Sequence, residues 1–375
     1  MRIVDLFSGA GGLTFGFYYK LINGHFVKND NCNIIFSNEV NHAAAESFRT
    51  NFPDITMLEK DIRELTEEEV KKLIGDREVD IVIGGPPCQS YSTIGKRIYD
   101  DKAKLYKEYY RLLNIIKPKM FLFENVKGIL SMKDENKKKV IDDIKNEFAN
   151  INSGFGYRIV YDVLDAVNFG VPQHRERVFI VGVRNDLKIE WKFPEGNNEL
   201  ITLEEAISDL PPISSGEEII EYGNLPINNF YQALMRENSN KLTCHFLSVY
   251  GDKIQTVMNN VIIGEGKDYI NSLVDTGILN EKYRLTSGYK NTYGRLYPDR
   301  PCTTITNNMS TPSGLRCIHY KQNRALTPRE GARIQSFPDW FEFKGNRTQI
   351  KVQIGNAVPP LLAIKIAETF EKVLL

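Results

Sequence analysis

The sequence DIVIGGPPCQSYS, at residues 80–92, is the strongest indication of how this chain folds. Its apolar start predicts a short buried strand, and the glycines and prolines that follow end this strand abruptly. Cys88 comes directly after the stop, so we expect its thiol at the carboxyl end of a strand, where ligands and catalytic groups gather in open α/β sheets. A free cysteine is also often a small buried apolar residue, and this stretch alone leaves both roles open.

The composition fits a chain with one large domain and a smaller one. It has 375 residues, of which 42% are hydrophobic. Its five cysteines are scattered without a CxxC pair, which indicates a reducing compartment and gives neither a disulfide framework nor a cysteine-based zinc site. No apolar run is long enough to span a bilayer, and no apolar leader opens the chain. We therefore expect a cytoplasmic protein without a membrane partner.

The charge of the chain is balanced overall but unevenly distributed. Forty-eight basic residues face 48 acidic ones, so net charge does not point to a nucleic-acid partner. Residues 291–335 nevertheless hold seven basic residues against Asp299 and Glu330. These seven are Arg295, Arg300, Arg316, Lys321, Arg324, Arg329 and Arg333. Arginine among tyrosines, threonines and asparagines suits phosphate and base contacts, and a solvated charged face explains the run equally well.

Polar residues follow the predicted strands of the N-terminal region. Residues 2–7 predict a buried strand, and the glycine-rich turn at residues 8–12 leads into a helix. The turn is not a dinucleotide fingerprint, because Thr14 occupies the place of the third glycine. Glu39 and Asp61 each follow a short strand, where a carboxylate can accept hydrogen bonds from a ribose. Each feature alone is equally well a structural turn or a solvated strand end, but together they favour a nucleotide-like site.

Charged residues also follow the next predicted strands. Glu124 comes directly after the apolar strand 120–123, where partial desolvation raises the pKa of a carboxyl group and equips it to donate a proton. Arg175 and Arg177 precede the strand 178–183 and share one of its faces, where they can bind a carbonyl or phosphate group. The alternatives are a helix cap for Glu124 and ion pairs with Glu176 for the arginines.

The pattern further along predicts several helices and a change of composition. Residues 188–290 contain short elements, many asparagines and the pair Pro211-Pro212, which indicates a separate, irregular domain. Thr327, Pro328 and Glu330 are typical of a helix start with a capping box. Residues 354–360 predict a turn that opens the last helix. The expected helices span residues 105–116, 133–148, 327–335 and 361–373, and the further expected strands span residues 34–38, 56–58 and 157–166.

Taken in order, these stretches resemble the DNA (cytosine-5) methyltransferase family in its compact prokaryotic form. The stretches are DLFSGAGG (5–12), NEV (38–40), GGPPCQSYS (84–92), ENVKG (124–128), QHRER (173–177), REGARIQSFPD (329–339) and IGNAVPP (354–360). They cover nearly the whole chain. The resemblance implies an α/β, Rossmann-like methyltransferase domain with a mixed, mostly parallel sheet. It implies that residues 1–187 and 320–375 form this domain, with the C-terminal helix folded back, and that residues 188–319 form a small target-recognition domain.

The resemblance also implies a mechanism. Cys88, as a thiolate, adds to carbon 6 of a cytosine while Glu124 hydrogen-bonds or protonates N3. Arg177, supported by Arg175, stabilises the O2 edge of the base. Carbon 5 then takes a methyl group from S-adenosylmethionine, and elimination releases the enzyme. A cytosine inside a duplex is out of reach, so the base must be flipped out, with residues 90–104 as the loop that closes over it.

The same resemblance assigns cofactor and DNA contacts. The cofactor-binding residues would be Phe7, Ser8, Gly9, Ala10, Gly11, Gly12, Glu39, Val40, Asp61, Ile62, Pro87, Leu105, Asn356, Ala357 and Val358. Many relatives carry a large apolar or aromatic residue and then an acid after the glutamate, whereas this chain has Val40-Asn41, which leaves the stacking on adenine undefined. The expected DNA contacts are Gln89, Ser90, Ser92, Lys96, Arg97, Arg295, Thr304 and Arg316. No metal is expected.

Other functions are argued against by particular residues. An amino-group methyltransferase would place an aromatic residue after its paired proline, where this chain has Cys88. A transfer-RNA methyltransferase shares the sequence around the cysteine, but the irregular region and residues 329–339 favour double-stranded DNA. A catalytically silent regulator would lack Cys88, Glu124 or Arg177, and Thr14 argues against a nicotinamide oxidoreductase. We expect a monomer with a cognate restriction endonuclease for the same site, whose sequence the chain does not reveal.

Overall fold

A seven-stranded sheet forms the centre of the computed structural model, which describes residues 1–87, 105–134, 137–151, 156–197, 199–290 and 292–375. The strand order is β5-β4-β1-β6-β7-β9-β8, with parallel pairing from β5 to β7 and antiparallel pairing for β9 and β8. The strands are β1 (Arg2–Leu6), β4 (Asn33–Asn38), β5 (Thr56–Leu58), β6 (Ile81–Gly84), β7 (Met120–Val126), β8 (Tyr157–Asp165) and β9 (Glu176–Arg184). This confirms the predicted mixed, mostly parallel α/β sheet.

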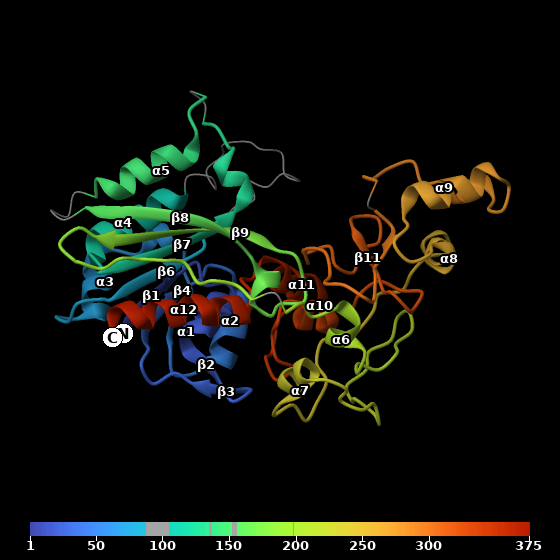
Figure 1. Cartoon of the computed structure of the whole chain (residues 1–375), viewed down its shortest axis with the longest axis horizontal. Helices are drawn as coiled ribbons and strands as arrows, with labels where there is room; N and C mark the ends of the chain where they lie inside the picture. Colours follow the sequence, from blue (N-terminus) through green and yellow to red (C-terminus); the bar gives the residue numbers. More distant parts are fainter. Residues whose placement is uncertain (88–104, 135–136, 152–155, 198, 291) are drawn as a thin grey trace.

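Helices cover both faces of this sheet, as Figure 1 shows for α4 and α5 on one side and α1 and α12 on the other. The covering helices are α1 (Gly12–Tyr18), α2 (His42–Asn51), α3 (Glu67–Ile74), α4 (Tyr106–Ile116), α5 (Val140–Ala149) and α12 (Pro360–Leu374). Because both faces are buried, the central strands are almost continuously apolar. Ile3 and Ile83 belong to the core on the α1 side, and Val4 and Val82 to the core on the α4 side.

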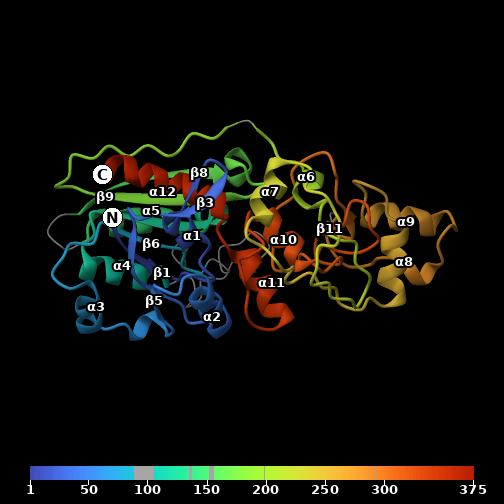
Figure 2. The same cartoon turned by 90° about the horizontal axis from the view of Figure 1, so that it is seen from below.

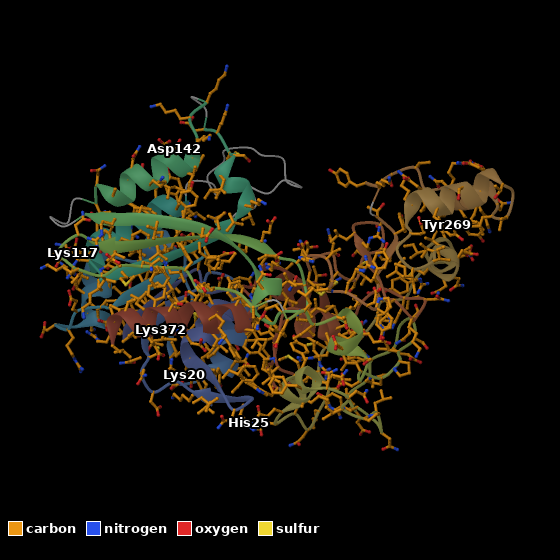
Figure 3. All side chains as sticks on the ribbon, viewed as in Figure 1. Lys20, His25, Lys117, Asp142, Tyr269 and Lys372 are labelled. Carbon is orange, nitrogen blue, oxygen red and sulfur yellow. The ribbon has the colours of Figure 1, made fainter. Side chains whose placement is uncertain are left out.

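The last helix returns the chain to the N-terminal half. Figure 1 shows the two termini side by side, with α12 lying along α1. The two helices approach so closely at Gly16 that a Cβ atom there would lie 2.1 Å from the carbonyl carbon of Ala363. Lys20, on β2 (Tyr19–Ile22), adds an ion pair of 2.7 Å to Glu371, and Figure 3 shows Lys20 and the neighbouring Lys372 on the same side of the molecule.

The remaining elements extend away from the sheet, as Figures 1 and 2 show. They are α6 (Leu203–Ile207), α7 (Phe230–Arg236), α8 (Asp252–Asn260), α9 (Lys267–Asp275), β10 (Gly294–Arg295), β11 (Arg316–Ile318), α10 (Pro328–Ile334) and α11 (Arg347–Asn356). Helices α6 and α7 share the large core with α10. Val257, Ile270 and Leu285 belong to a separate small core, and Tyr269 on α9 marks this outer part in Figure 3. The domain boundaries at residues 187 and 319 stay a prediction.

Two predicted segments differ from the structure, and a hairpin was not predicted. Helix α5 begins at Val140 instead of residue 133, because Lys137 has a φ of 64° in a turn and Lys133 pairs with Lys139. Residues 354–356 end helix α11, so the turn before α12 is shorter than predicted. The antiparallel hairpin of β2 and β3 (His25–Lys28) was missed although its turn, Asn23-Gly24 with φ angles of 50° and 82°, is the pair typical of a type I′ turn.

The start of α10 confirms the predicted capping box. The Thr327 hydroxyl accepts a hydrogen bond from the Glu330 amide, the Glu330 carboxylate accepts one from the Thr327 amide, and Pro328 occupies the first turn. In the part of the chain that the structure describes, no helix combines the length and the apolar character needed to cross a membrane.

We expect Gly16→Ala to destabilise the fold, because the atoms that its Cβ would meet are backbone atoms of Ala363 and Ile364, which cannot rotate away. Overpacking of this kind costs about 1–3 kcal/mol or more. The matched control is Gly251→Ala, where a Cβ would meet nothing within 4 Å and only the weaker helix cap of alanine, at most about 1 kcal/mol, is expected. Urea unfolding of both variants measures the difference, and equal stabilities would contradict the close packing of α1 on α12.

Candidate active site

The glycine-rich turn between β1 and α1 lies at the carboxyl edge of the sheet. Phe7, Gly9 and Gly11 have φ angles of 59°, 56° and 97°, so the chain reverses sharply there, and Ser8, Ala10 and Gly11 are buried. The Ser8 amide is bonded to the carbonyl of Asn38 at 3.0 Å, which fixes the turn to β4. A Cβ added at Gly9 would meet nothing within 4 Å. The turn can therefore receive a ligand at Gly9 without displacing protein atoms.

Glu39 closes one side of this turn. Its carboxylate accepts hydrogen bonds from the Gly9 amide at 2.9 Å and the Asn41 amide at 2.7 Å. Burial raises the pKa of Glu39, and the two backbone bonds oppose this shift. Each carboxylate oxygen has a further lone pair, so the group can still accept a ligand hydroxyl. The adjacent Val40 side chain is 63% exposed, which leaves an apolar surface uncovered beside the turn.

Asp61 differs from Glu39 because its carboxylate is paired with a charged side chain. It accepts hydrogen bonds from Arg63 at 2.9 Å and 2.5 Å, and these bonds lower its pKa to about 2. Ile62, the next residue, is buried and begins a 3-10 helix. The structure thus places Asp61 and Ile62 after β5, as predicted.

The C-terminal stretch reaches the same turn from the opposite side. A Cβ at Gly12 would lie 2.4 Å from the carbonyl oxygen of Val358 and 3.1 Å from Ala357. Only a glycine allows this approach, so the two predicted parts of the cofactor site meet. Asn356 is exposed beside them, and Leu105 lies at the N-terminus of α4.

Beneath the turn lies a buried polar pair that the sequence analysis did not single out. Asp5 and Ser37 are partners in the register of β1 and β4, and both side chains are 0% exposed. Asp5 accepts a hydrogen bond from the Thr14 hydroxyl, whereas its Oδ1 and the Ser37 hydroxyl have no partner among the described residues. Burial is the main cause that raises the pKa of Asp5 to about 7, and the charge of Glu39 adds to the shift.

Glu124 and Arg177 form the charged pair that the sequence predicted at the ends of β7 and β9. Arg177 Nε lies 3.2 Å from Glu124 Oε1, and both side chains are largely buried. Burial raises the pKa of Glu124, and the positive charges of Arg177 and Arg175 oppose the shift. A Cβ at Gly85 would lie 2.9 Å from Glu124 Oε2, so the turn that leads to Cys88 touches this carboxylate. The side-chain amide of Asn125 also donates to the carbonyl of Pro86 at 3.3 Å.

Arg175 is directed away from this pair, into the protein. Its side chain is 1% exposed and donates to the carbonyl oxygens of Ile305 and Gly355, both at 2.9 Å. Arg175 therefore joins three segments: the loop before β9, α11, and the predicted target-recognition domain at residues 188–319. The predicted domain is called the recognition region below. Its positive charge acts on Glu124, but its hydrogen bonds make it a positioning residue.

Several predicted site residues lie outside the described residues, or have another role. Cys88 and the expected DNA contacts Gln89, Ser90, Ser92, Lys96 and Arg97 are outside the described part of the chain. Pro87 is the last described residue before them.

The expected DNA contact of Arg295 needs correction. Five hydrogen bonds from its guanidinium go to the protein, and the side chain is buried. The acceptors belong to Met258, Val261, His319, Gln322 and Asn323. Because all five N–H groups are used, Arg295 stabilises the recognition region and has none left for DNA. Composition alone could not reveal these acceptors.

The other two predicted contacts are accessible in part. Arg316 uses Nη1 for the carbonyl oxygens of Gly264 and Arg295, at 2.6 Å and 3.1 Å, while its Nε and Nη2 make no hydrogen bond to the described residues. The Thr304 hydroxyl donates to the carbonyl of His174 at 2.7 Å. The bond of Thr304 therefore places it against the loop before β9, whereas Arg316 lies against residues 264 and 295.

One group of possible metal ligands exists among the described residues. Atoms of His42, Glu46 and Glu59 lie within 4.8 Å of one another. Arg49 pairs with both carboxylates at 2.6 Å, so their charge is already compensated. The group lies on the surface, and the structure gives no reason to assign a metal to it.

With this geometry established, comparison with known proteins decides the family. A model of C-5 cytosine-specific DNA methylases matches residues 1–372 of the chain. The chain belongs to this family. It is a DNA methyltransferase that modifies carbon 5 of cytosine, which confirms the resemblance found in the sequence.

Curated relatives of this methyltransferase are Type II enzymes. M.DdeI of Desulfomicrobium norvegicum is 35% identical over 98% of this chain and 88% of its own length. M1.HphI of Haemophilus parahaemolyticus is 34% identical over 99% of this chain and 87% of its own length. Both relatives match almost end to end, so the recognition region is included in the similarity.

Solved structures show the same fold. A crystal structure described as a DNA modification methyltransferase encoded within an E. coli prophage has a TM-score of 0.73 at 25% identity, covering 100% of this chain and 99% of that one. The Dnmt2 methyltransferase of S. pombe has a TM-score of 0.57 at 17% identity, covering 100% of both chains. The second similarity concerns the fold alone.

We expect the buried carboxyl of Asp5 to make stability depend on pH. Its pKa is about 7 in the folded protein against an ordinary value of 3.8, so its contribution is complete below pH 4 and is lost as pH rises to 7. The shift corresponds to roughly 4 kcal/mol at 1.36 kcal/mol per pKa unit. Relative to Asp5→Asn, the wild-type protein should lose stability between pH 4 and pH 7, measured by urea unfolding.

The matched control is Ser37→Ala, which removes the neighbouring hydroxyl and keeps the carboxyl. This variant should retain the pH dependence of the wild type. An Asp5→Asn variant with the same pH dependence as the wild type would show that Asp5 titrates normally.

Proposed function

We propose that this methyltransferase transfers the methyl group of S-adenosylmethionine to carbon 5 of a flipped-out cytosine within a specific short sequence of duplex DNA, through a covalent bond between Cys88 and carbon 6. The observation that carries the proposal is the buried pair of Glu124 and Arg177, 3.2 Å apart, with Gly85 of the GGPPC turn against the carboxylate. An acid with a raised pKa beside a cationic group fits a pyrimidine ring that must gain a proton at N3 and be held at O2.

The residues around the glycine turn fit S-adenosylmethionine. The open space at Gly9, the uncovered Val40 and the free lone pairs of Glu39 support a ligand that carries a ribose and an adenine. Glu39 would accept the ribose hydroxyls, and Phe7 with residues 8–12 would hold the methionine part. The orphaned Oδ1 of Asp5, beneath this turn, adds a negative end to the site when it is ionised. When bound, the cofactor supplies an electrophilic methyl group.

Val40, Asp61 and Ile62 would frame the adenine in this proposal. Since the Asp61 carboxylate is paired with Arg63, we assign Asp61 the role of positioning the segment after β5 and not that of a charged contact to the cofactor. Pro87, Leu105, Asn356, Ala357 and Val358 would complete the pocket. The close contact of Gly12 with Val358 supports this assignment, because it brings the last part of the chain to the turn.

The residues of this chain divide the chemistry among them. The Cys88 thiolate forms a bond to carbon 6, and Glu124 gives a proton to N3, so the electron pair of the ring becomes available at carbon 5. After methyl transfer, a solvent water takes the proton on carbon 5, the bond from sulfur to carbon 6 breaks and restores the thiolate, and N3 returns its proton to Glu124. Arg177 would hold O2 and keep Glu124 in place.

A transfer-RNA substrate is the second candidate, and the comparisons do not favour it. The relatives at 34% and 35% identity are Type II methyltransferases, whereas the Dnmt2 structure shares 17% of its residues and shows the fold alone. The Type II relatives also support a cognate restriction endonuclease that acts on the same site. A monomer in the cytoplasm completes the proposal.

Bisulfite sequencing of DNA from cells that express the protein should show methylated cytosines in one short sequence, and Cys88→Ala should abolish them. Since DNA binding does not need the thiol, the variant should still bind a duplex containing that sequence in a gel-shift assay. Cys32→Ala is the matched control, because burial raises the pKa of Cys32 to about 12 and leaves it unreactive. Full methylation by Cys88→Ala would refute the covalent mechanism.

We expect Glu124→Gln to lower kcat by about 10²- to 10⁴-fold, the usual range for general acid catalysis. Because the pKa of Glu124 is raised, the wild-type rate should fall as pH rises through that pKa. The rate of the Glu124→Gln variant should not show this fall. Glu176→Gln, which changes an exposed neighbour paired with Lys127 at 2.7 Å, serves as the control. An unchanged pH profile in Glu124→Gln would exclude the proton transfer.

A further inference from the structure

A small pocket lies where the recognition region meets the loop before β9. Its volume is about 230 Å³, and His174, Tyr297, Arg300, Thr303 and Arg316 are among its lining residues. Arg316 was expected from the sequence to contact DNA, and Arg300 belongs to the basic stretch that was suited to phosphate and base contacts. The pocket combines an apolar wall with three groups that can carry positive charge.

The Arg300 and Arg316 side chains lie beside the Tyr297 ring at the pocket and are at least partly accessible to solvent. The Arg300 guanidinium lies over the Tyr297 ring, 4.1 Å from its centroid, and the Arg316 guanidinium lies 6.0 Å from the same centroid. Arg300 has one acidic neighbour, Asp299, at 3.1 Å, and both side chains are more than half exposed. An exposed pair of this kind is weak and can be exchanged for another anion. The two arginines at the Tyr297 ring therefore give this wall of the pocket a positive charge.

His174 completes the opposite side of the pocket. Its side chain is 61% exposed, and Nδ1 lies 3.0 Å from Asp165 Oδ2. The bond to Asp165 fixes the ring so that the other nitrogen is directed to solvent or to a ligand. Asp165 also accepts a hydrogen bond from the Arg175 amide at 2.7 Å, so it is largely occupied by the protein.

Hydrogen bonds fix this pocket to the catalytic pair. The His174 amide donates to the carbonyl of Cys302, and the Cys302 amide donates to the carbonyl of Pro172, both at 2.9 Å. The Thr304 hydroxyl adds a third bond, to the carbonyl of His174. Arg177 follows three residues later, and three extended residues span at most about 10 Å. His174, at the pocket, therefore lies within about 10 Å of Arg177 along the chain.

We propose that this pocket binds a backbone phosphate of the DNA strand that carries the target cytosine, within about two nucleotides of that base. The inference rests on the proposed function, because it takes the base to lie against Glu124 and Arg177. Phosphates along one strand recur about every 3.4 Å of helix axis, so the first phosphates beside the target base fall within the span of at most about 10 Å that separates His174 from Arg177. Arg300, Arg316 and His174 would supply its hydrogen bonds, and the apolar wall would pack against the sugar.

The hydrogen-bonded connection gives this phosphate a role in positioning. A phosphate bound by Arg300 fixes the distance between the DNA strand and the loop that carries Arg177. We therefore expect loss of Arg300 to raise the KM for DNA and the dissociation constant, and to leave kcat at saturating DNA within about twofold, because the catalytic groups are unchanged.

The test uses duplexes with the recognised sequence found by bisulfite sequencing, each carrying one neutral methylphosphonate in place of a phosphate near the target. For the wild-type protein, one position should weaken binding by about tenfold or more, as expected for a charge-assisted contact. For Arg300→Gln, the same methylphosphonate should have little effect, because the contact is already lost. The slope of log Kd against log salt should fall in magnitude by about 0.9.

Two further variants keep the result clear. In His174→Gln, the methylphosphonate at the same position should have little effect on binding. Lys365→Gln, which removes a charge from α12, should respond to every methylphosphonate as the wild-type protein does. If Arg300→Gln and His174→Gln leave the effect of every methylphosphonate unchanged while the wild-type protein methylates its site, the phosphate site is refuted and the proposed function stands. Weaker binding by Arg300→Gln without a matching phosphate position would point to a base contact and also overturn the proposal.

Discussion

The burial of the Glu124 carboxyl group is the constraint around which the catalytic edge of this protein is arranged. A carboxylate in this position is costly, because desolvation favours its neutral form. Arg177 compensates part of the cost at 3.2 Å, and the backbone at Gly85 approaches so closely that a Cβ atom there would lie 2.9 Å from Glu124 Oε2 and would displace the carboxylate. Three strands, β6, β7 and β9, must keep their register for these groups to meet. The central sheet is therefore rigid where the chemistry takes place, and its variable parts lie elsewhere.

Local patterns in the sequence predicted the sheet well, because a strand buried on both faces is apolar almost throughout. They also located Glu39 and Glu124 at the carboxyl ends of strands and Arg177 at the start of one. Asp5 was missed although its signal is present: a single acid inside the apolar strand RIVDLF. Helix α5 was predicted too long because lysine favours a helix, while the positive φ of Lys137 depends on a turn that composition does not show.

The arginines of residues 291–335 show why charge counts are a poor guide to a DNA surface. Arg333 forms buried ion pairs with Asp339 at 2.6 Å and with Asp209, which follows α6. Arg324 is paired with Glu330 at 2.7 Å, and the pair holds the pKa of Glu330 at about 2. Such pairs are expensive to break on one side, about 3–5 kcal/mol, so these residues stabilise the junction between α10 and the recognition region. Glu330 and Asp339 lie only six residues from their arginines, whereas Asp209 is distant in sequence, and the charge count showed none of these pairs.

Arg175 links three segments of the chain, and this link limits which parts of the recognition region can move or change independently. Its guanidinium joins the loop before β9 to Ile305 and to Gly355, so the inner part of the recognition region cannot shift without disturbing the catalytic arginines. The outer part has its own small core around Val257 and Ile270, and Arg295 ties its helix α8 to residues 319–323. Any exchange of this outer part between relatives would therefore have to move Arg295 together with its five acceptors and leave the segment bound by Arg175 in place.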